Sequence, residues 1–330
     1  MTRRILPLLA AACATFLQNT VLSAQSVAVT SVPISHFRFG SEQTRFGALE
    51  FVGGFEMRAG EREFGQLSSI RFLTPGGDFV GVADNGHWFL GAIERDSDEV
   101  PVGVRDFRMQ AMVGPQGQVI ARKADKDAEG LEIFDDIATV SFEREARISE
   151  YRLDRDGMAD PIRDLDLVVP RNELRHNQGF ETLARAPEGG ALAGARLIIA
   201  ERSIDTNGDI FAAILEGPEK GVFKVRRTDD FDVTDGTFLP DGDLLLLERR
   251  FSLAQGIAMR LRRIAGANLR QGAVVDGEVL MEADLAYHID NMEGLDVWRR
   301  GDGALIVSLL SDDNQSFLQR TIYLEFVLGE

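Results

Sequence analysis

The sequence is poor in residues on which several classes of chemistry depend. Its one cysteine, Cys13, lies near the N-terminus, so we expect neither disulfides nor thiolate metal sites in the mature chain. The four histidines are scattered and never form a His-Glu-x-x-His motif. No Gly-x-Ser-x-Gly motif, phosphate-binding loop or dinucleotide fingerprint occurs. Zincin, serine hydrolase and nucleotide-binding functions therefore have no local support.

Long helical patterns and membrane-spanning runs are also missing. Residues 1–25 combine Arg3-Arg4 with an apolar stretch from Ile5 to Phe16 that is too short to cross a bilayer. This pattern predicts a cleaved signal peptide, followed by one domain over residues 26–330. We expect a periplasmic or secreted protein without a transmembrane segment, and leave open whether export uses the Sec or the Tat route. A lipoprotein anchored at Cys13 is not favoured, because no leucine stands three residues before it.

Positive charge is scarce relative to negative charge. The formal net charge is −17. A chain this acidic does not track phosphate backbones, so no nucleic-acid partner is expected. Solvated surface accounts for most of the acidic residues, and the remainder can attract metal ions. We expect a small-molecule substrate or ligand, and the oligomeric state is left open.

What the chain does contain is a short phrase repeated five times. The steps between successive phrases are 49 to 61 residues, a spacing typical of propellers and other repeat arrays. The five phrases are Ser68-Ser69-Ile70-Arg71, Glu129-Gly130-Leu131-Glu132, Gln178-Gly179-Phe180-Glu181, Thr234-Asp235-Gly236-Thr237 and Glu293-Gly294-Leu295-Asp296.

Each phrase opens an apolar stretch, a turn and a second apolar stretch. In the fourth repeat, for example, Pro240-Asp241-Gly242-Asp243 separates the phrase from Leu244 to Leu247. The pattern predicts an all-β propeller of four-stranded antiparallel blades. The strand-like segment from Phe46 to Met57 is expected to complete the last blade. Five phrases plus this extra material favour six blades, with five as the alternative, and residues 155–177 and 265–290 are expected to be longer connections.

Hairpin geometry returns the second strand of each blade to the end at which its phrase begins. Polar residues that follow the second strands should therefore gather at one mouth of the central channel. Glu132, Glu181 and Asp296 lie three positions beyond the phrase openers, so we expect them on the opposite face, bonded to neighbouring blades. The expected rim comprises Asp84, Asn85, Glu129, Glu143, Arg144, Gln178, Glu201, Arg202, Glu248, Arg249, Glu293, Asp312, Asp313 and Asn314.

Carboxylate and amide oxygens of this rim are the ligands that hard cations prefer, and Ca²⁺ takes six to eight of them. Such a cation polarises an ester or phosphoryl oxygen, while arginines hold a carboxylate or phosphate through two hydrogen bonds. The candidate metal ligands are Asp84, Asn85, Glu129, Glu293, Asp312 and Asn314. The candidate catalytic residues are Glu129, Glu293 and Asp84. The candidate substrate-binding residues are Arg144, Arg202, Arg249, His87 and Gln178.

Purely structural interpretations compete with these assignments. The adjacent pairs Glu143-Arg144, Glu201-Arg202 and Glu248-Arg249 are equally explained as salt bridges between blades. Asp84-Asn85-Gly86 is also a common turn sequence.

Several of these phrases together resemble a known group, the bacterial phytase-like family labelled "esterase-like activity of phytase". The resemblance covers about residues 45–328 and rests on Asp127-Ala128-Glu129-Gly130-Leu131-Glu132, Asn177-Gln178-Gly179-Phe180-Glu181, Leu239-Pro240-Asp241-Gly242-Asp243 with Leu247-Glu248-Arg249, and Asn291-Met292-Glu293-Gly294-Leu295 with Ser311-Asp312-Asp313-Asn314. It implies an exported β-propeller, by analogy with calcium-dependent propeller phytases, that hydrolyses esters or phosphoesters. Gln178, Thr234 and Ser68-Ser69 depart from the pattern and predict a less acidic rim in those blades, and no lysine follows any blade hairpin.

Three functional hypotheses follow from the sequence. The first is an exported, metal-assisted hydrolase of a small ester, lactone or phosphoester, with Ca²⁺ as the expected cofactor. The second is a non-catalytic periplasmic propeller that binds a ligand or a protein, because propellers host unrelated functions. The third is a lactonase similar to the gluconolactonase group, with a single metal at the channel floor.

Overall fold

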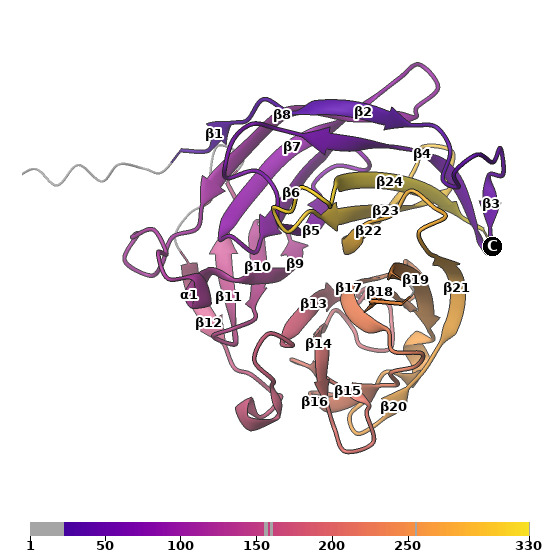
Figure 1. The fold of residues 1–330 in the computed structure, drawn as a ribbon. Coiled ribbons are helices and arrows are strands. Elements are labelled where there is room, and N and C mark those ends of the chain that lie inside the picture. The colour runs from indigo at the N-terminus through magenta and orange to yellow at the C-terminus, as the bar shows by residue number, and fades with distance from the viewer. Residues whose placement is uncertain (1–22, 155–157, 159–160, 255, 330) are drawn as a thin grey trace, which may run out of the picture.

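The protein is a closed ring of five sheets around a central axis, antiparallel except for one parallel pairing at the outer edge of the third sheet (Figure 1). The computed structural model describes residues 23–154, 158, 161–254 and 256–329. Each innermost strand contacts the innermost strand of the next blade, and the last contacts the first. The propeller prediction is confirmed, but the preferred count of six blades is wrong. The innermost strands are β5 (Leu67–Phe72), β9 (Ala128–Phe134), β13 (Phe180–Arg185), β17 (Asp232–Phe238) and β22 (Asn291–Arg299).

The first four blades are built outward from these strands in chain order, with extra strands added at two outer edges. In the first blade, β6 (Asp78–Ala83), β7 (His87–Arg95), β8 (Pro101–Ala111) and β1 (Gln25–Ser26) follow β5. In the second, β10 (Ile137–Phe142), β11 (Arg147–Arg152) and β12 (Pro161–Leu165) follow β9. In the third, β14 (Arg196–Ile204), β15 (Ile210–Ile214), β16 (Gly221–Val225) and β20 (Val274–Val275) follow β13. In the fourth, β18 (Leu244–Ser252), β19 (Gly256–Ile264) and β21 (Glu278–Ala283) follow β17.

The fifth blade combines strands from both ends of the described chain. Its order outward from β22 is β23 (Leu305–Asp312), β24 (Thr321–Leu328), β4 (Leu49–Arg58) and β2 (Thr30–Ile34), and β3 (Arg45–Phe46) pairs with β4. The antiparallel pairing of β24 with β4 runs from Thr321 opposite Met57 to Leu328 opposite Leu49. The strand-like segment from Phe46 to Met57 thus completes the last blade, as expected. It adds no sixth blade, because the last hairpin needs it as a fourth strand.

Local sequence explains where the inner hairpins turn. Gly242 adopts a φ of +94°, in the left-handed region that glycine enters without steric cost. The Asp241 carboxylate accepts a hydrogen bond from the Asp243 amide, which fixes the same turn. In the second blade, Asp135 has a φ of +52° between β9 and β10. The turns therefore lie at the aspartate-containing sequences that predicted them.

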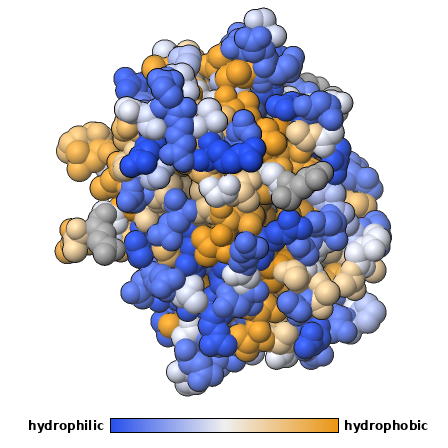
Figure 2. All heavy atoms as spheres, turned by 90° about the vertical axis from the view of Figure 1, so that its right-hand side faces the viewer, coloured by the Kyte–Doolittle hydropathy of each residue, from blue (hydrophilic) through white to orange (hydrophobic). Residues whose placement is uncertain are grey.

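The hydrophobic core lies between successive blades. One cluster joins Leu183 of β13, Ile199 of β14 and Leu246 of β18, all fully buried. Burial of one leucine side chain contributes about 1.5–3 kcal/mol, so facing sheets are strongly held together. Seen edge-on, the outside of the ring is mainly hydrophilic, with apolar side chains between the polar ones (Figure 2).

Segments expected to be long connections contain short strands. Residues 155–177 include β12 and the 3₁₀ helix η1 (Arg171–Glu173), and residues 265–290 include η2 (Gly266–Asn268), β20 and β21. The one α-helix of the described part, α1 (Lys123–Lys126), spans four residues. Among the described residues, no helix is long and apolar enough to cross a membrane. Residues 1–22, which hold Cys13 and most of the predicted signal peptide, lie outside the described residues, so export stays a prediction.

Candidate functional site

Every innermost strand carries a β-bulge at the repeated phrase. The pairing between the first and second strands shifts by one residue at this point in all five blades. A bulge leaves one residue without a cross-strand partner and redirects its side chain. The five bulged positions are Ser68, Glu129, Glu181, Thr234 and Glu293.

The bulge corrects the predicted register of the third phrase. The pairing shifts between Phe180 and Thr182, so Glu181 and not Gln178 is equivalent to Glu129 and Glu293. The placement of Glu181 on the opposite face of the strand is therefore wrong. The rim is also more acidic than the sequence analysis predicts, since a glutamate replaces a glutamine at this position.

The second strands supply another five equivalent positions at the same mouth. Asp84, Glu143 and Glu201 each donate a backbone hydrogen bond to a residue that precedes the bulge of their own blade. In the other two blades, Arg249 pairs with Asp232 and Asp312 pairs with Asn291. Arg249 thus takes the place that a carboxylate holds in the other four blades.

The predicted rim position of Glu248 is wrong. Glu248 is fully buried and forms ion pairs with Arg260 and Arg262 of β19. It pairs with Val233, one residue before the bulged Thr234, so it belongs to the interior of the blade. Its ion pairs stay within the fourth blade, whereas Arg249 beside it forms salt bridges between blades, as the structural interpretation expected.

Seven carboxylates and one arginine face one another at this mouth, which we call the acidic mouth. Carboxylates of different blades repel one another here, which raises their pKa values. The seven carboxylates are Asp84, Glu129, Glu143, Glu181, Glu201, Glu293 and Asp312. Burial, together with neighbouring carboxylates, raises the pKa of Glu143 and of Glu293 to about 7. Burial first, and then carboxylate neighbours, hold the pKa values of Glu129, Glu181 and Asp312 well above their ordinary range.

Arg249 offsets part of this negative charge. Its guanidinium lies 3.0 Å from Glu201 Oε1 and 3.0 Å from Glu293 Oε1. It also donates to the Asn291 side chain, which in turn donates to Glu293 Oε1 at 2.6 Å. Arg249 therefore ties the third, fourth and fifth blades together at the mouth.

Two groups of three carboxylates have the spacing that a single cation requires. One oxygen from each of Asp84, Asp127 and Glu129 lies within 4.8 Å of the others, and the same holds for Glu143, Glu181 and Glu201. Calcium binds oxygen at 2.3–2.6 Å, so oxygens about this far apart can share one ion.

The two groups differ in how far the protein already neutralises them. Lys123 lies 2.9 Å from Asp84 and 2.7 Å from Asp127, and Arg144 lies 2.7 Å from Asp127. Glu129 is 8% exposed, and no hydrogen-bond donor among the described residues reaches its carboxylate. One buried oxygen of Asp84, Oδ1, also lacks a partner.

The Glu143–Glu181–Glu201 group has fewer donors. Among the described residues, the Glu143 carboxylate accepts only the Gly179 backbone amide, at 3.2 Å, and Glu201 accepts Arg249. Glu181 is 9% exposed, and within the described part of the chain no donor reaches its carboxylate. Buried carboxylates without donors are costly, and a hard cation is the ligand that would satisfy both groups.

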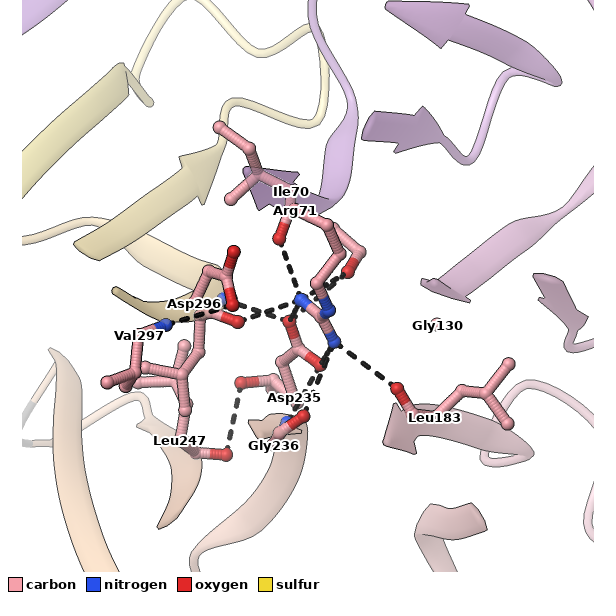
Figure 3. Close-up of polar contacts among 12 residues, drawn as sticks. Ile70, Arg71, Gly130, Leu183, Asp235, Gly236, Leu247, Asp296 and Val297 are labelled. Atoms are coloured by element: carbon pink, nitrogen blue, oxygen red, sulfur yellow. Dashed lines mark hydrogen bonds and ion pairs between the residues drawn. The ribbon is translucent and has the colours of Figure 1, made fainter. Parts of the chain in front are cut away.

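Farther along the axis, a fully bonded ion pair crosses the channel (Figure 3). Arg71 of β5 donates to both oxygens of Asp235 of β17, each at 2.9 Å. It also donates to the backbone carbonyls of Leu295 at 2.8 Å and Leu183 at 3.3 Å. We call Arg71 and Asp235 the axial pair; it links four of the five blades.

Two of the residues expected to bond across blades do so near the axial pair. Glu132 of β9 binds Arg185 of β13 at 2.6 Å. Asp296 of β22 accepts the Phe72 amide of β5 at 2.7 Å.

Some predicted site residues bind each other beside the acidic mouth. His87 Nδ1 lies 2.7 Å from Asn85 Oδ1, and the Asn85 amide donates to the Glu63 carbonyl. Gln178, with its amide oriented to satisfy both groups, accepts a hydrogen bond from Arg202 at 2.9 Å. Asn85 and His87 are thus engaged outside both carboxylate groups.

The remaining predicted residues divide between the mouth and its surroundings. Arg202 lies 3.3 Å from Asp232. Asn314 lines a cavity beside the mouth, and its backbone N–H donates to the Asp312 carboxylate. Asp313 turns away and accepts a hydrogen bond from the backbone N–H of Gln66 in the first blade.

Sequence reasoning missed Asp127, Glu181 and the axial pair as members of the channel. The alternation Asp127-Ala128-Glu129 was a usable signal, because residues two apart in a strand share a face. Arg71 within the apolar run Ile70 to Leu73 was another, since an arginine in a buried strand needs a partner.

Comparisons with known proteins were made by structure and by sequence family. Among solved structures, an endo-arabinase from Bacteroides thetaiotaomicron shares 12% identity at a TM-score of 0.47, covering 79% of this chain and 93% of its own. A hypothetical protein from Leishmania major shares 8% identity at a TM-score of 0.44, covering 81% and 86%. Similarities this low carry no functional argument, and a search of curated proteins finds no match. The family model described as "Phytase-like: Esterase-like activity of phytase" matches residues 62–315, and the chain belongs to this phytase-like family.

Proposed function

We propose that this protein is a cation-dependent hydrolase of a small ester, lactone or phosphoester, with the reacting group bound at the acidic mouth. The observation that carries the proposal is the pair Glu129 and Glu181. Both are buried at equivalent bulges, and no hydrogen-bond donor among the described residues reaches either one. Family membership supports the reaction class through its description alone.

The Glu143–Glu181–Glu201 group is the better candidate for the cation. Its carboxylates receive one backbone amide and one arginine, whereas Lys123 and Arg144 already neutralise part of Asp84 and Asp127. Ca²⁺ bound there would polarise the oxygen of an ester or phosphoryl group and lower the pKa of a bound water.

Glu293 is the candidate general base. Arg249 and Asn291 hold its Oε1, while no donor in the described ranges holds its Oε2. In hydrolysis, the oxygen of water bonds to the acyl carbon or phosphorus, and the bond from that atom to the leaving oxygen breaks. Glu293 Oε2 takes one proton of the water and then passes that proton to the leaving oxygen.

The arginines orient rather than react in this proposal. Arg249 positions Glu201 and Glu293 by its two ion pairs. Arg202 and Gln178, which bind each other, lie at the edge where the substrate enters. Arg144 positions Asp127 at 2.7 Å.

The test uses the purified protein without residues 1–25 and three substrates: p-nitrophenyl acetate, p-nitrophenyl phosphate and phytate. We expect turnover of at least one with Ca²⁺, loss of turnover with chelator, and at least a hundredfold lower kcat in Glu293→Gln, an order of magnitude typical of a lost general base. Glu145→Gln is the matched control, because Glu145 lies in the β10–β11 turn and is exposed.

Absence of chelator-sensitive turnover on all three substrates would contradict the proposal. A calcium-dependent rise in melting temperature without turnover would instead support the non-catalytic binding propeller.

A further inference from the structure

A large cavity opens beside the acidic mouth, between the third, fourth and fifth blades. Its volume is about 1320 Å³, larger than a typical pocket for a small ligand of 300–1,000 Å³. It shares Glu201, Arg249 and Asn291 with the mouth. A molecule whose reacting group lies at the mouth therefore has its remaining part directed into this cavity.

The most exposed large apolar side chains of the described residues come from segments that line this cavity. Five exceed 55% exposure, whereas the next, Phe39, reaches 52%. We call them the apolar rim: Phe251 at 69%, Leu253 at 98%, Leu285 at 58%, Phe317 at 96% and Leu318 at 77%. Exposed apolar patches next to a cleft mark binding surfaces.

The apolar rim comes from three separate loops on the same face of the propeller as the acidic mouth. Phe251 and Leu253 lie at the β18–β19 turn, Leu285 follows β21, and Phe317 with Leu318 lies between β23 and β24. Phe251, Leu285 and Leu318 line the cavity itself. The first two loops are in contact at Gly256, which begins β19 directly after the β18–β19 turn. Leu285 packs so closely on this glycine that an added Cβ would lie 2.4 Å from the leucine side chain.

Charges in the cavity are largely compensated by the protein. Arg227 lies 2.7 Å from Asp232 and 3.0 Å from Asp230, and Arg202 lies 3.3 Å from Asp232. No lysine lines the cavity. These contacts do not favour a polyanion, because four of the five arginines that line the cavity lie within 4 Å of a carboxylate. The fifth, Arg250, lies over the Phe231 ring, with its Cζ 4.7 Å from the ring centroid.

We infer that the substrate is an amphiphilic ester whose acyl or aryl arm lies in this cavity against Phe251, Leu285 and Leu318. The inference rests on the proposed hydrolytic function and adds its substrate class. Each buried methylene contributes about 0.8 kcal/mol when fully removed from water, so a longer acyl arm binds more tightly until the cavity is filled.

The experiment measures kcat/KM for p-nitrophenyl acetate, butyrate and octanoate, each below its micelle concentration. We expect the octanoate to exceed the acetate by at least tenfold. The double variant Phe251→Ser with Leu318→Ser should lose about tenfold on octanoate through KM and less than twofold on acetate. Ile162→Ser is the matched control, because Ile162 is 47% exposed on β12 of the second blade and should change neither value.

A second measurement separates this inference from the proposed function. Saturation-transfer NMR reports binding of 2-octanone, a ketone that cannot be hydrolysed, against 2-butanone. Binding of 2-octanone that is lost in the double variant supports the apolar subsite even if no ester is turned over. Turnover with equal kcat/KM for acetate and octanoate, or unchanged 2-octanone binding in the double variant, overturns the inference and leaves the hydrolase proposal intact.

Discussion

The propeller axis holds two charged regions that differ in one respect, the ratio of donors to acceptors. At the axial pair, the Arg71 guanidinium is bonded to both oxygens of Asp235 and to backbone carbonyls. At the acidic mouth, seven carboxylates share one arginine of their own ring, Arg249. Buried charge is tolerated when it is paired and hydrogen-bonded. The first region therefore contributes to the fold, whereas the second holds the buried carboxylates on which the proposed cation binding rests.

The largest effect is expected from breaking the axial pair. Arg71→Met leaves Asp235 buried without its counter-charge, which costs about 3–5 kcal/mol. Urea unfolding measures this loss. The double variant Arg71→Met with Asp235→Asn should be less destabilised than Arg71→Met alone, because the unpaired charge is gone. A single variant within 1 kcal/mol of wild type would show that the pair is not structural.

Adding a cation tests the other region. Ca²⁺ at 100 times its dissociation constant should raise the free energy of unfolding by about 2.7 kcal/mol, seen as a higher melting temperature. Glu181→Gln should abolish most of this response, because it removes the central ligand of the Glu143–Glu181–Glu201 group. Glu145→Gln should retain it. Equal responses of wild type and Glu181→Gln would argue against this cation site.

A pH titration sharpens the comparison at the axial pair. Burial, opposed by Arg71, raises the pKa of Asp296 to about 6 from its ordinary 3.8. The folded protein then holds a proton that the unfolded chain releases, so this contribution to stability is present below about pH 4 and lost as the pH rises through 6. The total is about 3 kcal/mol, from about 2.2 pKa units at 1.36 kcal/mol per unit. Urea unfolding of wild type and Asp296→Asn should therefore diverge between pH 4 and 7, and parallel curves would contradict this assignment.

The smallest effect is expected at the mouth without a cation. In chelator at pH 8, Glu181→Gln should stabilise the protein by about 1 kcal/mol, because it removes one charge from a group of repelling carboxylates. Chemical unfolding gives the value. A destabilised Glu181→Gln would mean that its carboxylate makes a favourable contact in the cation-free protein.

The repeated phrase predicted the inner hairpins and the mouth because both depend on local pattern. Strand pairing register was less accessible, since one extra residue in a strand redirects every side chain after it. In the third blade, Gln178-Gly179-Phe180-Glu181 imitates the pattern of Glu129-Gly130-Leu131-Glu132, while the true equivalent, Glu181-Thr182-Leu183, has threonine in place of glycine.

Two other errors have the same origin in long-range pairing. Glu248-Arg249 looks like Glu201-Arg202, yet a register one residue different puts the arginine at the mouth and the glutamate inside the blade. The six-blade preference counted the segment from Phe46 to Met57 as additional, although most of it pairs with β24 from the other end of the chain. Neither the strand register nor the β4–β24 pairing can be recognised from the residues that neighbour it in the sequence.

The pairing of β24 with β4 also sets an order of events during folding. Four blades consist almost wholly of neighbouring segments, so each can form soon after its own residues become available. The fifth must wait for β24, the last strand to be made, to meet β4, one of the first. Because contacts between distant segments form slowly, closure of the fifth blade is the expected late step, and until then the acidic groups of the first and fifth blades stay apart.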